Sequence, residues 1–399
     1  MKSTIKPFIA THYNLNFIKD FSKVVCPPYD IISKEDFLNF QKKSEYNFCN
    51  ILLSLDGDYK KIGIKFKEWL DKKILIDDDT ESLYLYEQKF SFNSKKITRF
   101  GIISLLRMDR KNLIMPHEHT LRSPKEDRKK IIEEVNANLS PIFMISFKKI
   151  KSLRRIYFKY SKKKPFLNLV DYENNLNRLW KISNKKDIEC IVNELENRKL
   201  LIADGHHRFE VAYEFYKKNK NKFKNLNYIL SYITDLQKGL LVLPIHRIVS
   251  VDLDENFFEK LKKYFYIDKI SKKDLFLRLK ERKRFCCGLY KSSNFYFLKL
   301  KENKLCLDKR YNGLDSYTLE KILKDFFRDR NRITYSHNLE EAINLTLNDK
   351  ALFILRQPDL SVIFKIVEKK LKLPQKSTFF YPKVLSGLVL RRFQKNEDI

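Results

Sequence analysis

A dense polar group, Asp204-Gly205-His206-His207-Arg208, follows a short apolar stretch of the chain. It combines a carboxylate, two imidazoles that can transfer protons and a permanent positive charge within a single turn. A turn that serves only the fold has no need of this combination. We therefore interpret the group as the centre of a functional site. The alternative is that Asp204 caps the following helix and the histidines are surface residues.

A second polar cluster, which opens with His117-Glu118-His119, lies earlier in the chain. Ser123 and Pro124 predict that a helix begins inside it, with Ser123 as the cap. On that helix Lys125 and Arg128 would lie about one turn apart and present two cations on a shared face. The alternative interpretation is a solvated helix start whose charges only cap the helix.

Two further segments carry residues suited to ligand binding. Tyr29 and Asp30 follow a pair of prolines, so they either face a pocket or belong to a rigid connector. Lys376, Ser377 and Lys383 lie in a proline-bounded segment with a Lys-Ser-Thr sequence, which would either hold phosphate or pack as a C-terminal loop.

The elements around Gly205 would position this chemistry. Residues 200–203 form a continuous apolar run, which predicts a strand covered on both faces. Gly205 permits a sharp turn, and the apolar spacing from Phe209 onward predicts a helix that begins near His206 or His207. The free N–H groups and partial positive charge of that helix start, beside Arg208, would suit a phosphate.

The remaining pattern predicts alternating strands and helices. Strands are expected at 5–9, 50–54, 83–90, 98–106, 142–145, 227–234 and 240–247, and helices from Lys34 and at 62–71 and 187–197. Beyond about residue 250, helices around 255–264 and 272–280 precede strands near 284–290 and 295–301. We expect an α+β fold with a catalytic domain at 1–250 and an accessory α+β domain at 251–399, whose Lys-Ser-Thr loop returns to the site.

Composition narrows the class of protein. The 399 residues are 43% hydrophobic and carry a formal net charge of +31. The charge is compatible with a nucleic-acid partner, but the lysines are spread along the whole chain, which favours a compositional bias instead. Six cysteines without paired spacing, no signal peptide and no long apolar run indicate a cytoplasmic protein without a membrane partner.

Four motifs in one order carry a resemblance to a known family. They are Val25-Cys26-Pro27-Pro28-Tyr29-Asp30, His117-Glu118 with Pro124 to Arg128, Ala203 to Arg208, and Lys376 to Lys383. The chain resembles the bacterial family called domain of unknown function 1015 over nearly its whole length. The segment Asp204 to Arg208 is also similar to the nucleotide-binding motif of ParB-like proteins, a group that includes sulfiredoxin and free serine kinases. This second resemblance implies a ParB/sulfiredoxin-like core in which Arg208 and the helix start hold phosphate.

These observations favour an enzyme, a phosphotransferase that moves a phosphoryl group between a nucleotide (ATP or ADP) and a small hydroxyl compound, possibly serine. Gly205, Arg208, Lys125 and Arg128 would bind the phosphates, and Lys376, Ser377 and Lys383 would close over them. Asp204 and Glu118 would hold Mg²⁺. Glu118 is the first candidate for the general base, followed by His206 and His207.

Two alternatives remain open from the sequence. His117, His119, His206 and His207 could form an imidazole-rich zinc or manganese site of a metal-dependent hydrolase or phosphatase. A nucleotide-switched or nucleic-acid-binding protein would instead account for the ParB likeness and the positive charge.

Overall fold

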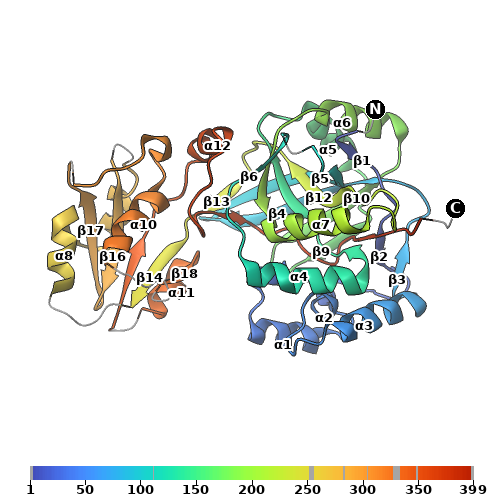
Figure 1. The fold of residues 1–399 in the computed structure, drawn as a ribbon, viewed down its shortest axis with the longest axis horizontal. Coiled ribbons are helices and arrows are strands. Elements are labelled where there is room, and N and C mark those ends of the chain that lie inside the picture. Colours follow the sequence, from blue (N-terminus) through green and yellow to red (C-terminus); the bar gives the residue numbers. More distant parts are fainter. Residues whose placement is uncertain are drawn as a thin grey trace. The chain divides into compact units, whose positions relative to one another are not determined.

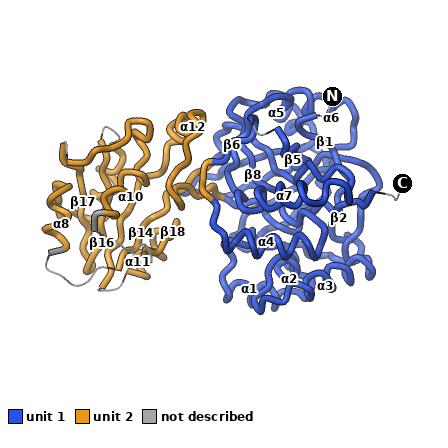
Figure 2. Tube along the Cα trace, in the orientation of Figure 1, with its two compact units in different colours: residues 1–116, 120–240, 382–399 blue, residues 117–119, 241–381 orange. Residues whose placement is uncertain are grey.

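The structure is a computed structural model that describes residues 3–110, 112–250, 256–281, 284–302, 304–326, 333–346 and 349–396. The chain divides into two compact units, shown in blue and orange in Figure 2. Unit 1 comprises residues 1–116, 120–240 and 382–399, and unit 2 comprises residues 117–119 and 241–381. Each unit combines a large sheet with helices, so the fold is α+β as the sequence predicts.

Among the described residues, a nine-stranded mixed sheet forms the centre of unit 1 (Figure 1). Its order is β6-β11-β8-β12-β5-β4-β10-β9, and β1 also pairs with β5. The strands are β1 (Ile5–Lys6), β4 (Leu83–Phe92), β5 (Lys95–Arg107), β6 (Ile114–Pro116), β8 (Ile142–Ser146), β9 (Leu167–Val170), β10 (Leu176–Ile182), β11 (Leu200–Asp204) and β12 (Tyr228–Thr234). Strand β11 runs parallel to β6 and antiparallel to β8; β6 pairs only with Leu200 to Ile202, so among the described strands the end of β11 at Asp204 is paired with β8 alone.

Helices and short strands surround this sheet. The helices are α1 (Lys34–Lys43), α2 (Cys49–Leu52), α3 (Tyr59–Asp71), α4 (Arg122–Val135), α5 (Lys151–Tyr160), α6 (Lys185–Leu195) and α7 (His206–Asn219), with 3-10 turns η1 (Phe21–Lys23) and η2 (Tyr29–Ile31). Two small sheets pair β2 (Thr11–Tyr13) with β3 (Leu75–Asp77), and β7 (Ala137–Asn138) with β21 (Arg391–Arg392). The strand predicted at 50–54 is wrong, because Asn47 accepts a hydrogen bond from the backbone N–H of Cys49 and α2 starts there.

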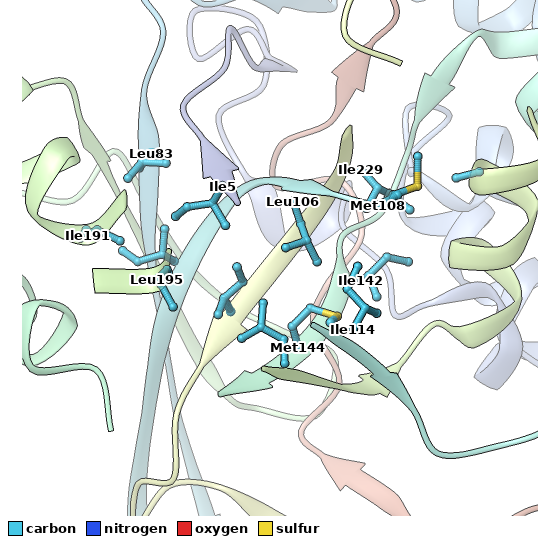
Figure 3. Close-up of a cluster of buried hydrophobic side chains, with 14 of the residues drawn as sticks. Ile5, Leu83, Leu106, Met108, Ile114, Ile142, Met144, Ile191, Leu195 and Ile229 are labelled. Carbon is cyan, nitrogen blue, oxygen red and sulfur yellow. The ribbon is translucent and has the colours of Figure 1, made fainter. Parts of the chain in front are cut away.

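The apolar core of unit 1 explains why the sequences of β8 and β11 are mostly continuous runs of apolar residues. Every residue of both strands is buried, as expected for strands covered on both faces. Figure 3 shows Ile142 and Met144 of β8 in one cluster with Leu106 of β5 and Leu195 of α6. The predicted strand at 200–203 is therefore confirmed.

Unit 2 contains a six-stranded sheet in the order β15-β17-β16-β19-β14-β18, together with a two-stranded sheet of β13 and β20, counted over its described residues. The strands are β13 (Leu241–Leu243), β14 (His246–Ser250), β15 (Phe265–Ile270), β16 (Cys286–Lys291), β17 (Asn294–Leu300), β18 (Ile333–Ser336), β19 (Lys350–Ile354) and β20 (Phe379–Tyr381). The helices are α8 (Asn256–Tyr264), α9 (Lys272–Arg278), α10 (Asp315–Phe326), α11 (Leu339–Asn344) and α12 (Leu360–Glu368), with the 3-10 turn η3 (Lys309–Tyr311).

The strand predicted at 240–247 is divided between the two sheets of unit 2. Strand β13 ends at Leu243 and β14 begins at His246, so Pro244 lies in the break. Proline has no backbone N–H to donate to a ladder, which favours a strand end at this position. Over the described residues, no helix is both long enough and apolar enough to cross a bilayer.

Candidate functional site

The turn between β11 and α7 is shaped by one glycine. Gly205 has a φ of 91°, a left-handed conformation that residues with a Cβ rarely adopt, and α7 begins at the next residue. A Cβ at this position would lie 2.9 Å from Nη2 of Arg208 and 3.0 Å from Cδ1 of Ile142. The sharp turn that the sequence predicts at Gly205 is therefore confirmed. The absence of a Cβ also leaves room for the guanidinium of Arg208 against the turn.

Asp204, at the end of β11, is bound by two cations within unit 1. Its Oδ2 accepts a hydrogen bond of 2.8 Å from Nη2 of Arg208, and its Oδ1 accepts one from Nζ of Lys383. All three side chains are about one-tenth exposed. Arg208 also donates from Nη1 to the carbonyl of Pro141 at 2.9 Å. Asp204 carries one negative charge and Arg208 and Lys383 carry one positive charge each, so this largely buried group has a net positive charge.

One donor of Arg208 lacks an acceptor in the described part of the chain. Its Nε is buried and has no hydrogen-bond partner among the described residues. Arg208 also lines a cavity of about 50 Å³, together with Arg128 and apolar side chains such as Leu52 and Ile131. A buried N–H without a partner costs about 1–3 kcal/mol, so an acceptor oxygen beside it would be favoured.

Arg128 is already committed to the fold. It stacks on the ring of Tyr29 at 3.8 Å, donates from Nε to Asp127 at 2.7 Å and donates from Nη1 to the carbonyl of Leu52 at 2.9 Å. Burial raises the pKa of Tyr29 above its usual range, and Asp30 adds to this rise while Arg128 and Arg208 oppose it. Asp30 itself is exposed. The predicted residues Tyr29, Arg128, Arg208 and Asp204 thus come together within unit 1.

Helices α4 and α7 are joined through their polar residues. The backbone N–H of Leu121 donates to Nε2 of His207 at 2.9 Å, so His207 caps α4 from the neighbouring helix. The prediction that Ser123 caps this helix is wrong, because α4 already begins at Arg122. Lys125 forms a salt bridge of 3.3 Å with Glu210 of α7. His206, the first residue of α7, is buried.

A buried pair on the central sheet holds the segment that carries Lys383. Gln88 of β4 and Arg99 of β5 are register partners, and both are fully buried. Arg99 donates to the carbonyl of Pro382, and Gln88 donates from Nε2 to the carbonyl of Lys383 at 3.0 Å. Sequence reasoning missed this pair. Arginine is rarely fully buried, so its position within the predicted strand 98–106 was the signal that could have found it.

The other predicted site residues belong to unit 2. The imidazole of His117 is buried and lies 3.0 Å from Oγ1 of Thr378, while Glu118 is partly exposed. Lys376 is exposed. Ser377 is buried and donates to the carbonyl of Pro374 at 2.6 Å, so its hydroxyl stabilises the loop. The roles of Glu118, Lys376 and Ser377 at a phosphate stay predictions, because these residues and Asp204 fall in different units.

The candidate metal ligands are divided between the two units. Across the residues that the structure describes, no group of three or more His, Cys, Asp or Glu side chains is placed to hold a metal ion. The predicted imidazole-rich site stays a prediction, because His117 and His119 belong to unit 2 whereas His206 and His207 belong to unit 1. Both oxygens of Asp204 already accept hydrogen bonds from cations, so Asp204 alone does not form a metal site.

Comparison with protein families identifies the chain at the level of its family. The family described as "Protein of unknown function (DUF1015)" matches residues 5–321. The chain belongs to this family. The part of the chain that matches the DUF1015 family includes Lys125 and Asp204 to Arg208, and it ends before Lys383. No curated protein matches the sequence.

Solved structures resemble this DUF1015 chain at low identity. A conserved hypothetical protein from Pyrococcus furiosus is 15% identical, with a TM-score of 0.38, over 74% of this chain and 95% of that one. A variant of free serine kinase in complex with ADP is 14% identical, with a TM-score of 0.39, over 70% and 87% of the two chains. A C-terminally truncated SbnI from Staphylococcus aureus is 10% identical, with a TM-score of 0.39, over 71% and 85%.

Proposed function

We propose that this protein is a phosphotransferase that moves a phosphoryl group between a nucleotide and a small hydroxyl compound, with serine as the first compound to test. The observation that carries the proposal is the buried guanidinium of Arg208. It lies at the start of α7, keeps an unpartnered Nε–H and lines a cavity beside a second arginine. A positive charge, a spare donor and a helix N-terminus are the features that favour phosphate.

In this proposal the residues of unit 1 position and neutralise phosphate. Phosphoryl transfer requires little covalent chemistry from the protein and depends on charge and alignment. Arg208 and Lys383 supply the positive charge, and the N–H groups at the start of α7 supply further donors. Asp204 keeps both cations in place and is the carboxylate in unit 1 that could accept the hydroxyl proton once Lys383 turns to the phosphate. Glu118 of unit 2 remains the alternative general base.

We further propose that Mg²⁺ enters as the complex of the nucleotide. Magnesium is commonly held by one or two carboxylates together with the phosphates of a substrate and several waters. Because the protein provides no three-ligand group among its described residues, phosphate oxygens would supply most of the coordination. The ion would neutralise charge on the phosphates.

The test is an assay for phosphoserine by phosphorus NMR, with L-serine, Mg²⁺ and either ATP or ADP. Arg208→Met should lower kcat/KM by roughly 100-fold, in line with the loss of one preorganised donor to a developing charge. Arg154→Met on the exposed face of α5 removes the same charge elsewhere in unit 1 and should leave the rate unchanged. Equal rates for both variants, or no phosphoserine from the wild-type protein, would reject serine kinase activity at this site. Turnover unchanged in a folded Glu118→Gln variant would remove Glu118 from the mechanism.

A further inference from the structure

A second cavity is built entirely from residues of unit 2. It has a volume of about 400 Å³ and lies between α10, the turn η3 and the segment from Lys372 to Gln375, with His119 at its border. Cavities that bind small molecules usually measure about 300–1,000 Å³, so this one has the size of a ligand site. The proposed phosphotransferase chemistry in unit 1 makes no use of it.

The cavity has an excess of positive charge. Lys321, Lys324 and Lys372 line it, and Glu320 is its one carboxylate. Lys324 lies 3.7 Å from Glu320, so this pair is largely neutralised. Lys321 and Lys372 are half-buried, and neither has a carboxylate within 4 Å among the described residues. Two ammonium groups that are partly removed from water and have no carboxylate in direct contact, among the described residues, would gain from binding an anion.

One wall of the cavity is held rigid by buried polar contacts. The carbonyl of His117 accepts a hydrogen bond of 2.7 Å from the backbone N–H of Leu373. Ser316 of α10 donates to the hydroxyl of Ser377 at 2.9 Å. Arg247, which is buried, donates from Nη2 to the carbonyl of Lys376 at 3.0 Å. These contacts fix the loop that carries Lys372 and reduce the ordering cost of binding.

Two aromatic rings link the other walls. Tyr311 of η3 and Tyr317 of α10 are stacked, with ring centroids 4.3 Å apart and an interplanar angle of 10°. The hydroxyl of Tyr311 donates to the carbonyl of Lys372 at 3.0 Å. The ammonium of Lys321 lies 5.7 Å from the centroid of the Tyr317 ring. The rings therefore connect the parts of the chain that carry the two unpaired lysines.

We propose that this cavity is a binding site for a phosphorylated small molecule, whose phosphate groups pair with Lys321 and Lys372. The phosphate is the group recognised, because the unpaired charges of the cavity are positive and its walls are preorganised. The inference stands independently of the phosphotransferase proposal, since every residue in it belongs to unit 2.

Isothermal titration of the full chain with pyrophosphate, at physiological salt, tests the proposal. A Lys321→Met/Lys372→Met variant should bind pyrophosphate at one site at least 10-fold more weakly than the wild-type protein. The matched control is Lys269→Met/Lys299→Met, which removes two exposed charges from β15 and β17 and should bind as the wild type does. Equal weakening by both variants would indicate attraction by bulk charge and would overturn the proposal.

Two further titrations separate this cavity from the site in unit 1 and from recognition of the base. In a background of Arg208→Met, pyrophosphate should still bind at one site, and adding Lys321→Met/Lys372→Met should abolish that binding. Persistence of binding in the combined variant would overturn the inference. In the same Arg208→Met background, adenosine, which has no phosphate, should not bind, and binding of adenosine as tight as that of ADP would reject phosphate as the recognised group. If the wild-type protein forms no phosphoserine but binds pyrophosphate in the cavity of unit 2, the phosphotransferase proposal fails and the proposal for this cavity stands.

Discussion

The cations of unit 1 differ in how much of their hydrogen-bonding capacity the fold already uses. Arg128 is stacked on Tyr29 and bonded to Asp127 and a backbone carbonyl, and Lys125 is paired with Glu210. Arg208 retains a buried donor without a partner in the described structure. From the sequence these three side chains look equivalent as phosphate ligands. The contacts rank Arg208 first, because an acceptor on a ligand would give its buried Nε–H a hydrogen-bond partner. Binding to Arg128 or Lys125 would instead compete with the contacts that these residues already make.

His207 provides a prediction that separates structure from chemistry. His207→Ala removes the acceptor for the N–H of Leu121 and should lower the free energy of unfolding by about 1 kcal/mol, the usual value of a helix cap. His207→Asn can still accept a hydrogen bond and should restore part of the loss. Chemical denaturation of the three proteins gives the comparison. If alanine and asparagine both leave the stability unchanged, the cap contributes nothing and a role in catalysis gains weight.

At the scale of elements, the strand-to-helix turn of β11 and α7 was predictable because its signals are local. A covered apolar run, a glycine and a helical period follow each other within a few residues. The helix start at Arg122 was not predictable, because the cap of α4 comes from His207, which is far away in the sequence. The same limit applies to Lys383. No local pattern indicates that its ammonium pairs with Asp204, or that Gln88 and Arg99 hold its backbone.

The glycine of this turn offers a matched experiment. Gly205→Ala should lower the free energy of unfolding by about 1–3 kcal/mol for the left-handed backbone, and by more because the new Cβ meets Arg208 and Ile142. Gly57→Ala is the control, since Gly57 also has a positive φ of 77° but has no atom within 4 Å of the new Cβ. Thermal unfolding measures stability, and pyrophosphate titration in a Lys321→Met/Lys372→Met background, which removes the site in unit 2, measures the displacement of Arg208. Identical losses in both variants would mean that crowding at the turn has no effect.

At the scale of the molecule, the two units should respond differently to acid. His246 of unit 2 is buried, and its Nδ1 accepts a hydrogen bond of 3.2 Å from the backbone N–H of Leu355. Burial, followed by the charges of Arg247 and His337, lowers the pKa of His246 from 6.5 to about 4. Between these two pKa values, His246 is protonated in the unfolded chain and neutral in the folded chain. Stability from this residue is therefore complete above pH 6.5 and is lost as the pH falls toward 4.

This loss should reach about 3 kcal/mol for unit 2 at pH 4, from the difference between the two pKa values. Urea denaturation at pH 7 and pH 4, monitored by probes in each unit, would measure it. His246→Asn keeps an acceptor for the N–H of Leu355 but cannot gain the charge, so the variant should lose less stability in acid than the wild type. An unchanged pH dependence in the variant would assign the acid sensitivity to other groups.

The return of residues 382–399 to unit 1 has a consequence for biosynthesis. Ribosomes build a chain from its N-terminus, so all of residues 241–381 are made before Lys383 emerges. Until then, Asp204 lacks one of its two cations, and Gln88 and Arg99 lack the backbone carbonyls that they hold in the finished protein. A nascent chain that already contains most of the central sheet would thus carry buried polar groups without their partners, and the charged cluster of Asp204, Arg208 and Lys383 would be completed late in translation.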